Sequence, residues 1–156
     1  MAQKALNLED IVAGNIIQTK GIGSMTWLKD GERYSRLENN KQTGGTDIVA
    51  YRAKDNSREV IIPSSLLTDK STGRPIPVRS VSWSADNEKV LIYNNTRRVW
   101  RYDTRGDYWV LNLKDGALRQ LGKGMPESSM MFAKFSPDGT RVAYVSNNNI
   151  YVEDID

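Results

Sequence analysis

The sequence contains no cysteine and no histidine. Without cysteine the chain can form no disulfide, thiolate nucleophile or cysteine-ligated zinc site, and its redox compartment stays open. Without histidine it can assemble neither a Ser–His or Cys–His nucleophile system nor a histidine-ligated metal site. The sequence also lacks a calcium loop of the Asp-x-Asn/Asp-x-Asn/Asp-Gly type. We therefore expect no metal, no cofactor and no hydrolytic catalysis by this chain alone.

Long apolar runs and a strong charge excess are lacking too. No apolar run approaches the ~20 residues that span a bilayer, and residues 1–20 carry no signal-peptide pattern. The 22 Lys and Arg residues against 19 Asp and Glu residues give a formal net charge of +3, spread along the chain. Trp100 and Tyr102 alternate with arginines as on a platform for single-stranded nucleic acid, but a half-buried strand gives the same alternation. We expect neither a membrane span nor a nucleic-acid partner.

One design occurs three times in the sequence: an aromatic residue on a short apolar strand, a turn and a second strand. The copies cover residues 25–34, 81–90 and 133–142, with equivalent aromatic residues at Trp27, Trp83 and Phe135. The separations of 56 and 52 residues between these aromatics fit a repeat of roughly 50 residues. Equivalent aromatics in successive repeats pack between the units, so we predict that these three and Trp109 are buried structural residues and not ligand-stacking ones.

Each copy contains a tight hairpin turn whose second residue tolerates a positive φ. The turn residues are Asp30-Gly31, Asp86-Asn87 and Asp138-Gly139. Further strands with alternating character follow the turns, at residues 47–51, 107–113 and 149–152. A helix is predicted for residues 6–12, with Asn7 as its N-cap.

A repeat of this kind is typical of a β-propeller blade. The predicted fold class is all-β, a partial β-propeller of about two to three four-stranded antiparallel blades with a short N-terminal helix. The predicted divisions are a lead-in over residues 1–20, blade-like repeats over 21–78 and 79–125, and an incomplete repeat over 126–156. Propellers close with typically 4–8 blades, so we expect this chain to be part of a longer propeller. Open blade edges also favour association into a homo-oligomer.

Several segments carry a family resemblance that covers nearly all of the chain. They are residues 8–11, 21–27, 99–102, 107–110, 135–139 and 149–152. Together they resemble the N-terminal propeller of the dipeptidyl peptidase IV branch of the prolyl oligopeptidase family, and Trp100-Arg101 followed by residues 107–110 is the most specific part. The resemblance implies a bacterial serine exopeptidase, periplasmic or secreted. In that family the propeller caps an α/β-hydrolase domain with a Ser-Asp-His triad, and the enzyme releases dipeptides from peptide N-termini.

The resemblance also implies one substrate-binding residue, Arg101. The family's arginine at this place reaches into the cavity and hydrogen-bonds a carbonyl of the peptide substrate, a task that suits a planar guanidinium. On spacing alone, Arg101 is one of four arginines in a loop, a setting in which basic residues usually only solvate a surface. The family's glutamate pair, which grips the substrate's N-terminal ammonium, lies downstream of residues 149–152. Glu153 and Asp154 do not match that pair.

No catalytic residue is predicted in this chain. The nearest phrase to a Gly-x-Ser-x-Gly nucleophile elbow is residues 21–25, where Ser24 precedes a strand and does not sit on a strand-to-helix turn. Two functions stay open. The first is the substrate-gating and substrate-positioning propeller of a dipeptidyl peptidase IV-like serine exopeptidase, with a hydrolase domain elsewhere in the same parent chain. The second is a non-catalytic, TolB-like propeller that acts as a protein-interaction scaffold.

Overall fold

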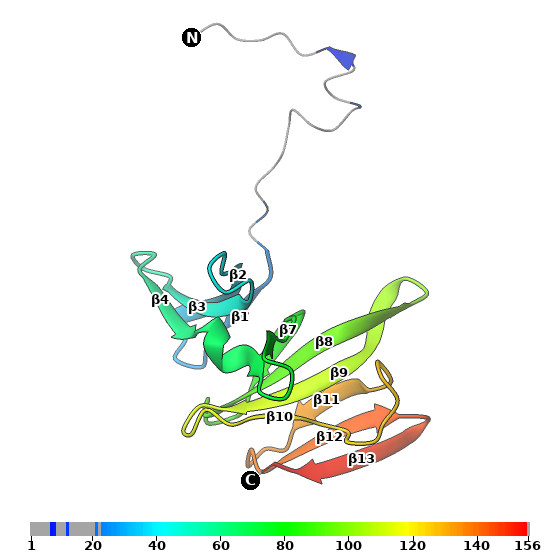
Figure 1. Cartoon of the computed structure of the whole chain (residues 1–156). Coiled ribbons are helices and arrows are strands. Elements are labelled where there is room, and N and C mark those ends of the chain that lie inside the picture. The colour runs from blue at the N-terminus through cyan, green and yellow to red at the C-terminus, as the bar shows by residue number, and fades with distance from the viewer. Residues whose placement is uncertain (1–6, 9–11, 13–20, 22, 156) are drawn as a thin grey trace, which may run out of the picture.

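The computed structural model describes residues 7–8, 12, 21 and 23–155, and strands make up nearly all of the regular structure in them. Neighbouring strands pair antiparallel, and the chain forms a partial β-propeller (Figure 1). The predicted all-β fold class is confirmed. The predicted helix over residues 6–12 lies largely outside the described residues. No helix among the residues that the structure describes is long and apolar enough to cross a membrane.

Three sheets follow one another along the chain, as the blades of a propeller do (Figure 1). Sheet 1 contains, in spatial order, β1 (Met25–Trp27), β2 (Arg33–Asn39), β3 (Thr46–Arg52) and β4 (Arg58–Ile62). Sheet 2 contains β10 (Leu118–Gln120), β9 (Tyr102–Asn112), β8 (Lys89–Val99) and β7 (Ser80–Trp83). Sheet 3 contains β11 (Met131–Phe135), β12 (Arg141–Ser146) and β13 (Asn149–Asp154). Sheets 1 and 2 are connected through the 3-10 helix η1 (Ser64–Leu67) and the two-stranded ribbon of β5 (Thr68–Asp69) and β6 (Arg74–Pro75).

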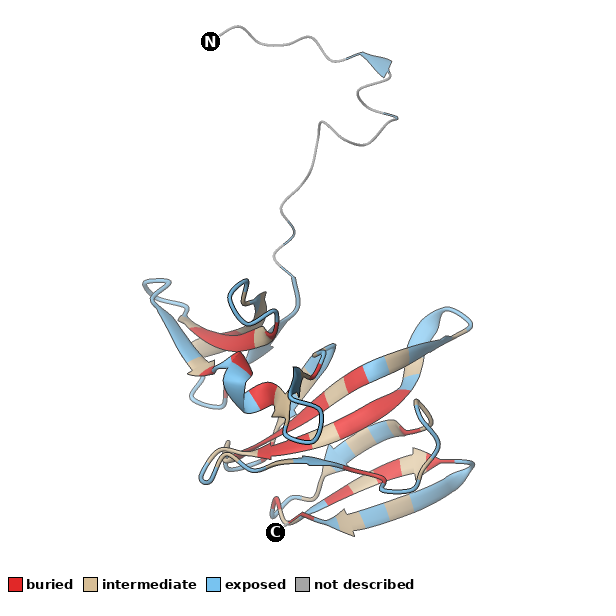
Figure 2. Cartoon of the chain, in the orientation of Figure 1, coloured by how far each residue is buried: buried red, intermediate tan, exposed pale blue. Residues whose placement is uncertain are grey.

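Two hydrophobic clusters fill the spaces between the sheets. The first cluster joins sheets 1 and 2, and its buried members are Ile48, Ile62, Leu67, Ile76, Val90, Ile92 and Leu111. The second cluster joins sheet 2 to sheet 3, and its buried members are Leu91, Tyr108, Val110, Leu121, Met130, Val142, Tyr144 and Ile155. Figure 2 shows long buried stretches along β8 and β9, the two central strands of sheet 2.

β8 contributes to both clusters with consecutive residues. Val90 and Ile92 belong to the first cluster, whereas Leu91 between them belongs to the second. Successive side chains of a strand point to opposite faces, so three buried apolar residues in a row require a sheet on each side. Sheet 2 is therefore the middle layer, while sheets 1 and 3 each bury one face against it.

The four repeat aromatics differ in burial. Trp83 and Trp109 are half-buried against the first cluster, and Phe135 is half-buried against the second. Trp27 is 60% exposed, so the prediction that it is buried is wrong. Trp27 lies on the edge strand β1 and packs edge-on against Tyr34, with 5.9 Å between the ring centroids, outside the first cluster. Burial of Trp27 requires a further surface against this outer face of sheet 1.

The hairpin turns of the three repeats have the predicted backbone. Gly31, Asn87 and Gly139 adopt φ values of 70°, 58° and 71°. Glycine reaches this left-handed region without steric cost, and asparagine reaches it more readily than other residues with a Cβ. The Asp-Gly and Asp-Asn pairs therefore fix where each of these hairpins reverses.

A serine and an aspartate stabilise the second and third turns in the same way. Ser84 Oγ donates to Asp86 Oδ1 at 2.5 Å, and Ser136 Oγ donates to Asp138 Oδ1 at 2.5 Å. These hydrogen bonds favour the charged carboxylates, so they lower the pKa of Asp86 and lower that of Asp138 to about 2.

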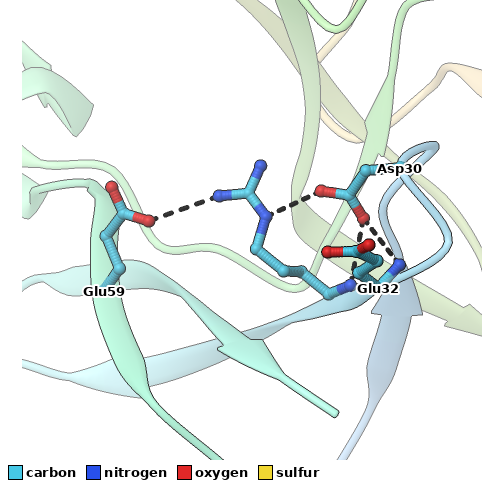
Figure 3. A network of polar contacts seen from close by, with 4 residues as sticks. Asp30, Glu32 and Glu59 are labelled. Carbon is cyan, nitrogen blue, oxygen red and sulfur yellow. Dashed lines mark hydrogen bonds and ion pairs between the residues drawn. The ribbon is translucent and has the colours of Figure 1, made fainter. Parts of the chain in front are cut away.

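In the first turn the aspartate is also hydrogen-bonded, but the donor is an arginine and not a serine. Leu28 stands where the other repeats have serine, and Arg33 supplies the missing donor. Arg33 Nε donates to Asp30 Oδ2 at 2.7 Å, and Arg33 Nη1 reaches Glu59 Oε2 on β4 at 3.3 Å (Figure 3). The bond from Arg33 is the largest cause of the lowered pKa of Asp30.

Candidate functional site

The β8–β9 hairpin extends beyond the rest of sheet 2. β7 pairs with β8 only over residues 90–93, and β10 pairs with β9 only over residues 109–111, whereas β8 and β9 pair with each other as far as Val99 and Tyr102. Figure 1 shows this hairpin projecting away from the three sheets. The four arginines expected in a loop lie instead on the two strands (Arg97, Arg98, Arg105) and in the turn between them (Arg101). The loop interpretation is therefore wrong for Arg97, Arg98 and Arg105, whereas Arg101 does lie outside the strands.

Trp100 and Arg101 form the two-residue turn at the tip of this hairpin. Trp100 has a φ of 62°, whereas Arg101 is absent from the positive-φ residues of the described chain. A positive φ at the first turn residue alone is typical of a type II′ hairpin turn, where glycine is the usual residue. Trp100 is 94% exposed, so packing against the described residues does not compensate for its unfavourable backbone.

A polar network braces the base of the hairpin. Asn95, at an irregularity of β8 with a φ of 44°, donates through Nδ2 to Asp107 Oδ2 at 2.6 Å and to Glu127 Oε1 at 2.8 Å. The other carboxylate oxygen, Asp107 Oδ1, accepts the backbone N–H of Ser128 at 2.8 Å. These bonds join both strands of the hairpin to the connection between sheets 2 and 3. Side chains at the base of the β8–β9 hairpin therefore fix the direction in which its outer part projects.

An open hollow of about 580 Å³ lies beside the hairpin. The residues that line it are Ser24, Arg79, Ser80, Tyr93, Arg98, Arg101, Tyr102 and Asp103. They come from the segment before β1, from the first residue of β7 and the residue before it, and from β8, β9 and the turn between them. The hollow contains Arg101, the one substrate-binding residue that the sequence predicts.

Tyr93 and Asp103 organise one side of the hollow. Tyr93 donates its hydroxyl to the backbone oxygen of Asp103 at 3.0 Å and stacks on Tyr108, with 4.8 Å between the ring centroids. Burial is the main cause that raises the pKa of Tyr93 to about 12, so the phenol stays neutral and keeps its proton for this bond. Arg79 Nη2 reaches Asp103 Oδ2 at 3.2 Å, which ties the start of β7 to the hairpin.

Arg101 forms no hydrogen bond or ion pair with any residue of the described part of the chain. The two nearby aspartates that could hold it in a structural salt bridge are engaged elsewhere, since Asp103 contacts Arg79 and Asp107 accepts bonds from Asn95 and Ser128. An unpaired guanidinium beside a hollow can donate to acceptors that a ligand brings. The role of Arg101 in substrate binding stays a prediction.

The described residues contain no group of three or more His, Cys, Asp or Glu that could hold a metal ion. Ser24 lies in the segment directly before β1 and not on a strand-to-helix turn, so it has no elbow geometry. The arrangement offers guanidinium, hydroxyl and aromatic groups that can bind and orient a ligand.

The second half of the chain matches a protein-family model. Residues 84–156 match the dipeptidyl peptidase IV N-terminal region. The matched range includes the hairpin with Arg101 and all of sheet 3.

Individual proteins similar to this chain include dipeptidyl-aminopeptidases B of fungi. A probable dipeptidyl-aminopeptidase B of Aspergillus oryzae is 27% identical over 124 residues, which are 79% of this chain and 13% of that protein. The dipeptidyl aminopeptidase B of Saccharomyces cerevisiae is 27% identical over 152 residues, 91% of this chain and 17% of that protein. The chain thus spans less than a fifth of the length of these relatives.

The fold is similar to part of a solved structure, dipeptidyl peptidase 4 of Porphyromonas gingivalis. The TM-score is 0.69 at 21% sequence identity, over 99% of this chain and 21% of that chain. The chain therefore shares the β-propeller fold of the part of that structure that it matches.

Sequence reasoning identified Asp103 only as a candidate for a structural salt bridge with Arg101, and it did not identify Arg79, Tyr93 and Arg98 as lining the same hollow. One signal could have placed Arg98 and Asp103 there. A hairpin centred on the two-residue turn at 100–101 pairs Val99 with Tyr102 and hence Arg98 with Asp103, as the structure does. Nothing local in the sequence indicates that Arg79, on another strand, reaches the same place.

Proposed function

We propose that this chain is the substrate-positioning part of the propeller of a dipeptidyl peptidase IV-like serine exopeptidase, which releases dipeptides from peptide N-termini. The observation that carries the proposal is Arg101, an unpaired guanidinium beside a hollow of about 580 Å³, at the tip of a hairpin whose base is held by hydrogen bonds, within the range matched by the family model. The hydrolase domain with the serine nucleophile belongs to another part of the same protein, since this chain contains no histidine. We further propose a bacterial enzyme that is periplasmic or secreted, on the family resemblance.

Arg101 acts by binding, not by chemistry. Its guanidinium donates charge-assisted hydrogen bonds to a backbone carbonyl near the substrate's N-terminus and so holds the peptide in one orientation. The rigid base of the hairpin, with Asn95 and Asp107, and the stacked Tyr93 keep this donor in place before the peptide arrives. The free energy gained from positioning then contributes to kcat/KM of a reaction carried out elsewhere.

The test uses the full-length protein and a chromogenic Xaa-Pro or Xaa-Ala dipeptidyl substrate. A charge-assisted hydrogen bond contributes about 1.5–3 kcal/mol, so Arg101→Ala should lower kcat/KM roughly tenfold to a hundredfold without changing the melting temperature. Arg101→Lys should recover only part of the loss, because an ammonium cannot reproduce the fork of donors. Arg105→Ala is the matched control, since Arg105 lies on the same hairpin but does not line the hollow.

Three results would count against the proposal. If Arg101→Ala and Arg101→Lys kept the wild-type kcat/KM, Arg101 would be a solvated surface residue. If activity and thermal stability fell together, its role would be structural. If the full-length protein released no dipeptide at all, the non-catalytic scaffold would be the better account of this propeller.

A further inference from the structure

The hollow beside Arg101 holds more positive charge than the binding of one carbonyl needs. Arg79, Arg98 and Arg101 line it, and Asp103 is the one carboxylate among its lining residues. The strand register places Asp103 opposite Arg98, yet its carboxylate contacts Arg79 at 3.2 Å. Arg98 and Arg101 are therefore two guanidiniums without an ion pair among the described residues, on one side of the same hollow.

The remaining lining groups do not neutralise this charge. Tyr93 donates its hydroxyl to a backbone oxygen and stays neutral, and Ser24, Ser80 and Tyr102 contribute hydroxyl groups. The site is thus rich in hydrogen-bond donors and poor in anionic acceptors. A volume of about 580 Å³ falls within the range of small-ligand sites and can accept a peptide side chain.

We propose that Arg98, beside Arg101, receives the carboxylate of an aspartate or glutamate side chain within the first two residues of the peptide substrate. The inference rests on the proposed function, because Arg101 on a backbone carbonyl is what brings the first residues of the peptide to the hollow. A guanidinium matches a carboxylate with two parallel N–H···O bonds, which adds selectivity to attraction. Arg98 is in this sense a specificity-determining residue and takes no part in the reacting bonds.

The register of the hairpin supplies a control within the same strand. Arg97 pairs with Arg105, one position before the pair of Arg98 with Asp103, and neither Arg97 nor Arg105 lines the hollow. Arg97→Gln and Arg98→Gln remove the same charge from adjacent, exposed positions of β8. A general electrostatic attraction responds alike to both variants, whereas a bound carboxylate responds only to the loss of Arg98.

The experiment titrates the ¹⁵N-labelled 156-residue chain with two C-terminally amidated peptides, Glu-Ala-Ala-Ala amide and Gln-Ala-Ala-Ala amide. Their one difference is the side-chain carboxylate, and NMR shifts of the hairpin report the dissociation constants. An exposed ion pair gives a preference of about fivefold for the glutamate peptide. The preference should shrink when salt rises from about 50 mM to about 500 mM, because the charges are screened. Arg98→Gln should abolish it and Arg97→Gln should keep it, while Arg101→Gln should weaken both peptides.

The other results overturn the inference and separate it from the proposed function. Equal binding of both peptides, with both weakened by Arg101→Gln, would remove the acidic preference and leave the peptide-positioning function standing. An equal loss of preference in Arg97→Gln and Arg98→Gln would reduce the effect to the general charge of the hairpin. Absence of binding by either peptide up to tens of millimolar would overturn the carboxylate site. The substrate-positioning function would then be tested separately, by the effect of the Arg101 variants on kcat/KM.

Discussion

Replacement of Gly106 by alanine tests whether close packing at the base of the hairpin shapes the candidate site. Gly106 lies in β9, where its N–H and C=O pair with the backbone of Met130 at 3.0 and 3.1 Å. A Cβ at this position would lie 2.4 Å from Cε2 of Tyr93 and 2.6 Å from the backbone oxygen of Asn94. Carbon atoms in good contact are about 3.5–4.0 Å apart, so both neighbours would have to move by about 1 Å.

Neither neighbour can move freely. The Tyr93 ring is stacked on Tyr108, and its hydroxyl is bonded to Asp103. The second neighbour is main chain within β8. Overpacking of this kind costs about 1–3 kcal/mol, and we expect Gly106→Ala to lower the free energy of unfolding by an amount near the upper end.

Urea unfolding followed by fluorescence measures this change. With an m-value of about 2 kcal/mol/M, the midpoint should fall by about 1–1.5 M. An ultraviolet pH titration should also show the pKa of Tyr93 falling from about 12 towards the usual value, because the displaced ring is less buried. Gly21→Ala is the control, since a Cβ there meets no atom within 4 Å. A midpoint for Gly106→Ala equal to that of Gly21→Ala would refute the packing argument.

Further predictions concern the aromatics and the turn aspartates. Trp83→Ala should cost about 2–4 kcal/mol in a denaturant titration, because a half-buried ring leaves the first cluster, whereas Trp27→Ala should cost less than about 1 kcal/mol. Equal costs would contradict the observed difference in burial. The folded-state pKa of Asp138, at about 2, lies below its ordinary value of 3.8, so its contribution to stability is complete above about pH 4 and is lost as the pH falls towards 2. Asp138→Asn should flatten the pH dependence of the melting temperature in that interval, and an unchanged slope would show that this hydrogen-bonded carboxylate does not stabilise the fold.

The fold class and the turns could be predicted because their causes are local or repetitive. The Asp-Gly and Asp-Asn pairs place a residue that tolerates positive φ four positions after the strand aromatic, and Gly31, Asn87 and Gly139 all adopt a positive φ. The burial of Trp27 could not be predicted in the same way. It depends on whether another surface covers the outer face of sheet 1, and the pattern around Trp27 is the same in either case.

The candidate site could be predicted only at one residue, and through a resemblance. The resemblance at Trp100-Arg101 predicts a substrate-binding role for Arg101. The hollow, in contrast, is formed by segments that are distant in sequence. Arg79 reaches Asp103 because β7 and β9 both pair with β8. The pairing of β8 is irregular between Asn94 and Arg98, and this irregularity changes the direction of its outer part. The position of such irregularities follows from side-chain networks like that of Asn95, which no periodicity in the sequence reveals.

The middle position of sheet 2 determines how stability is distributed along the chain. Each sheet is built from consecutive strands and touches only the sheet before and after it, so the free energy of unfolding is close to a sum of sheet terms and two interface terms. Loss of sheet 1 or sheet 3 removes one interface, but loss of sheet 2 removes both. Amide protons of β8, between Val90 and Ile92, should therefore exchange with solvent most slowly, and both outer sheets can open while the centre stays folded.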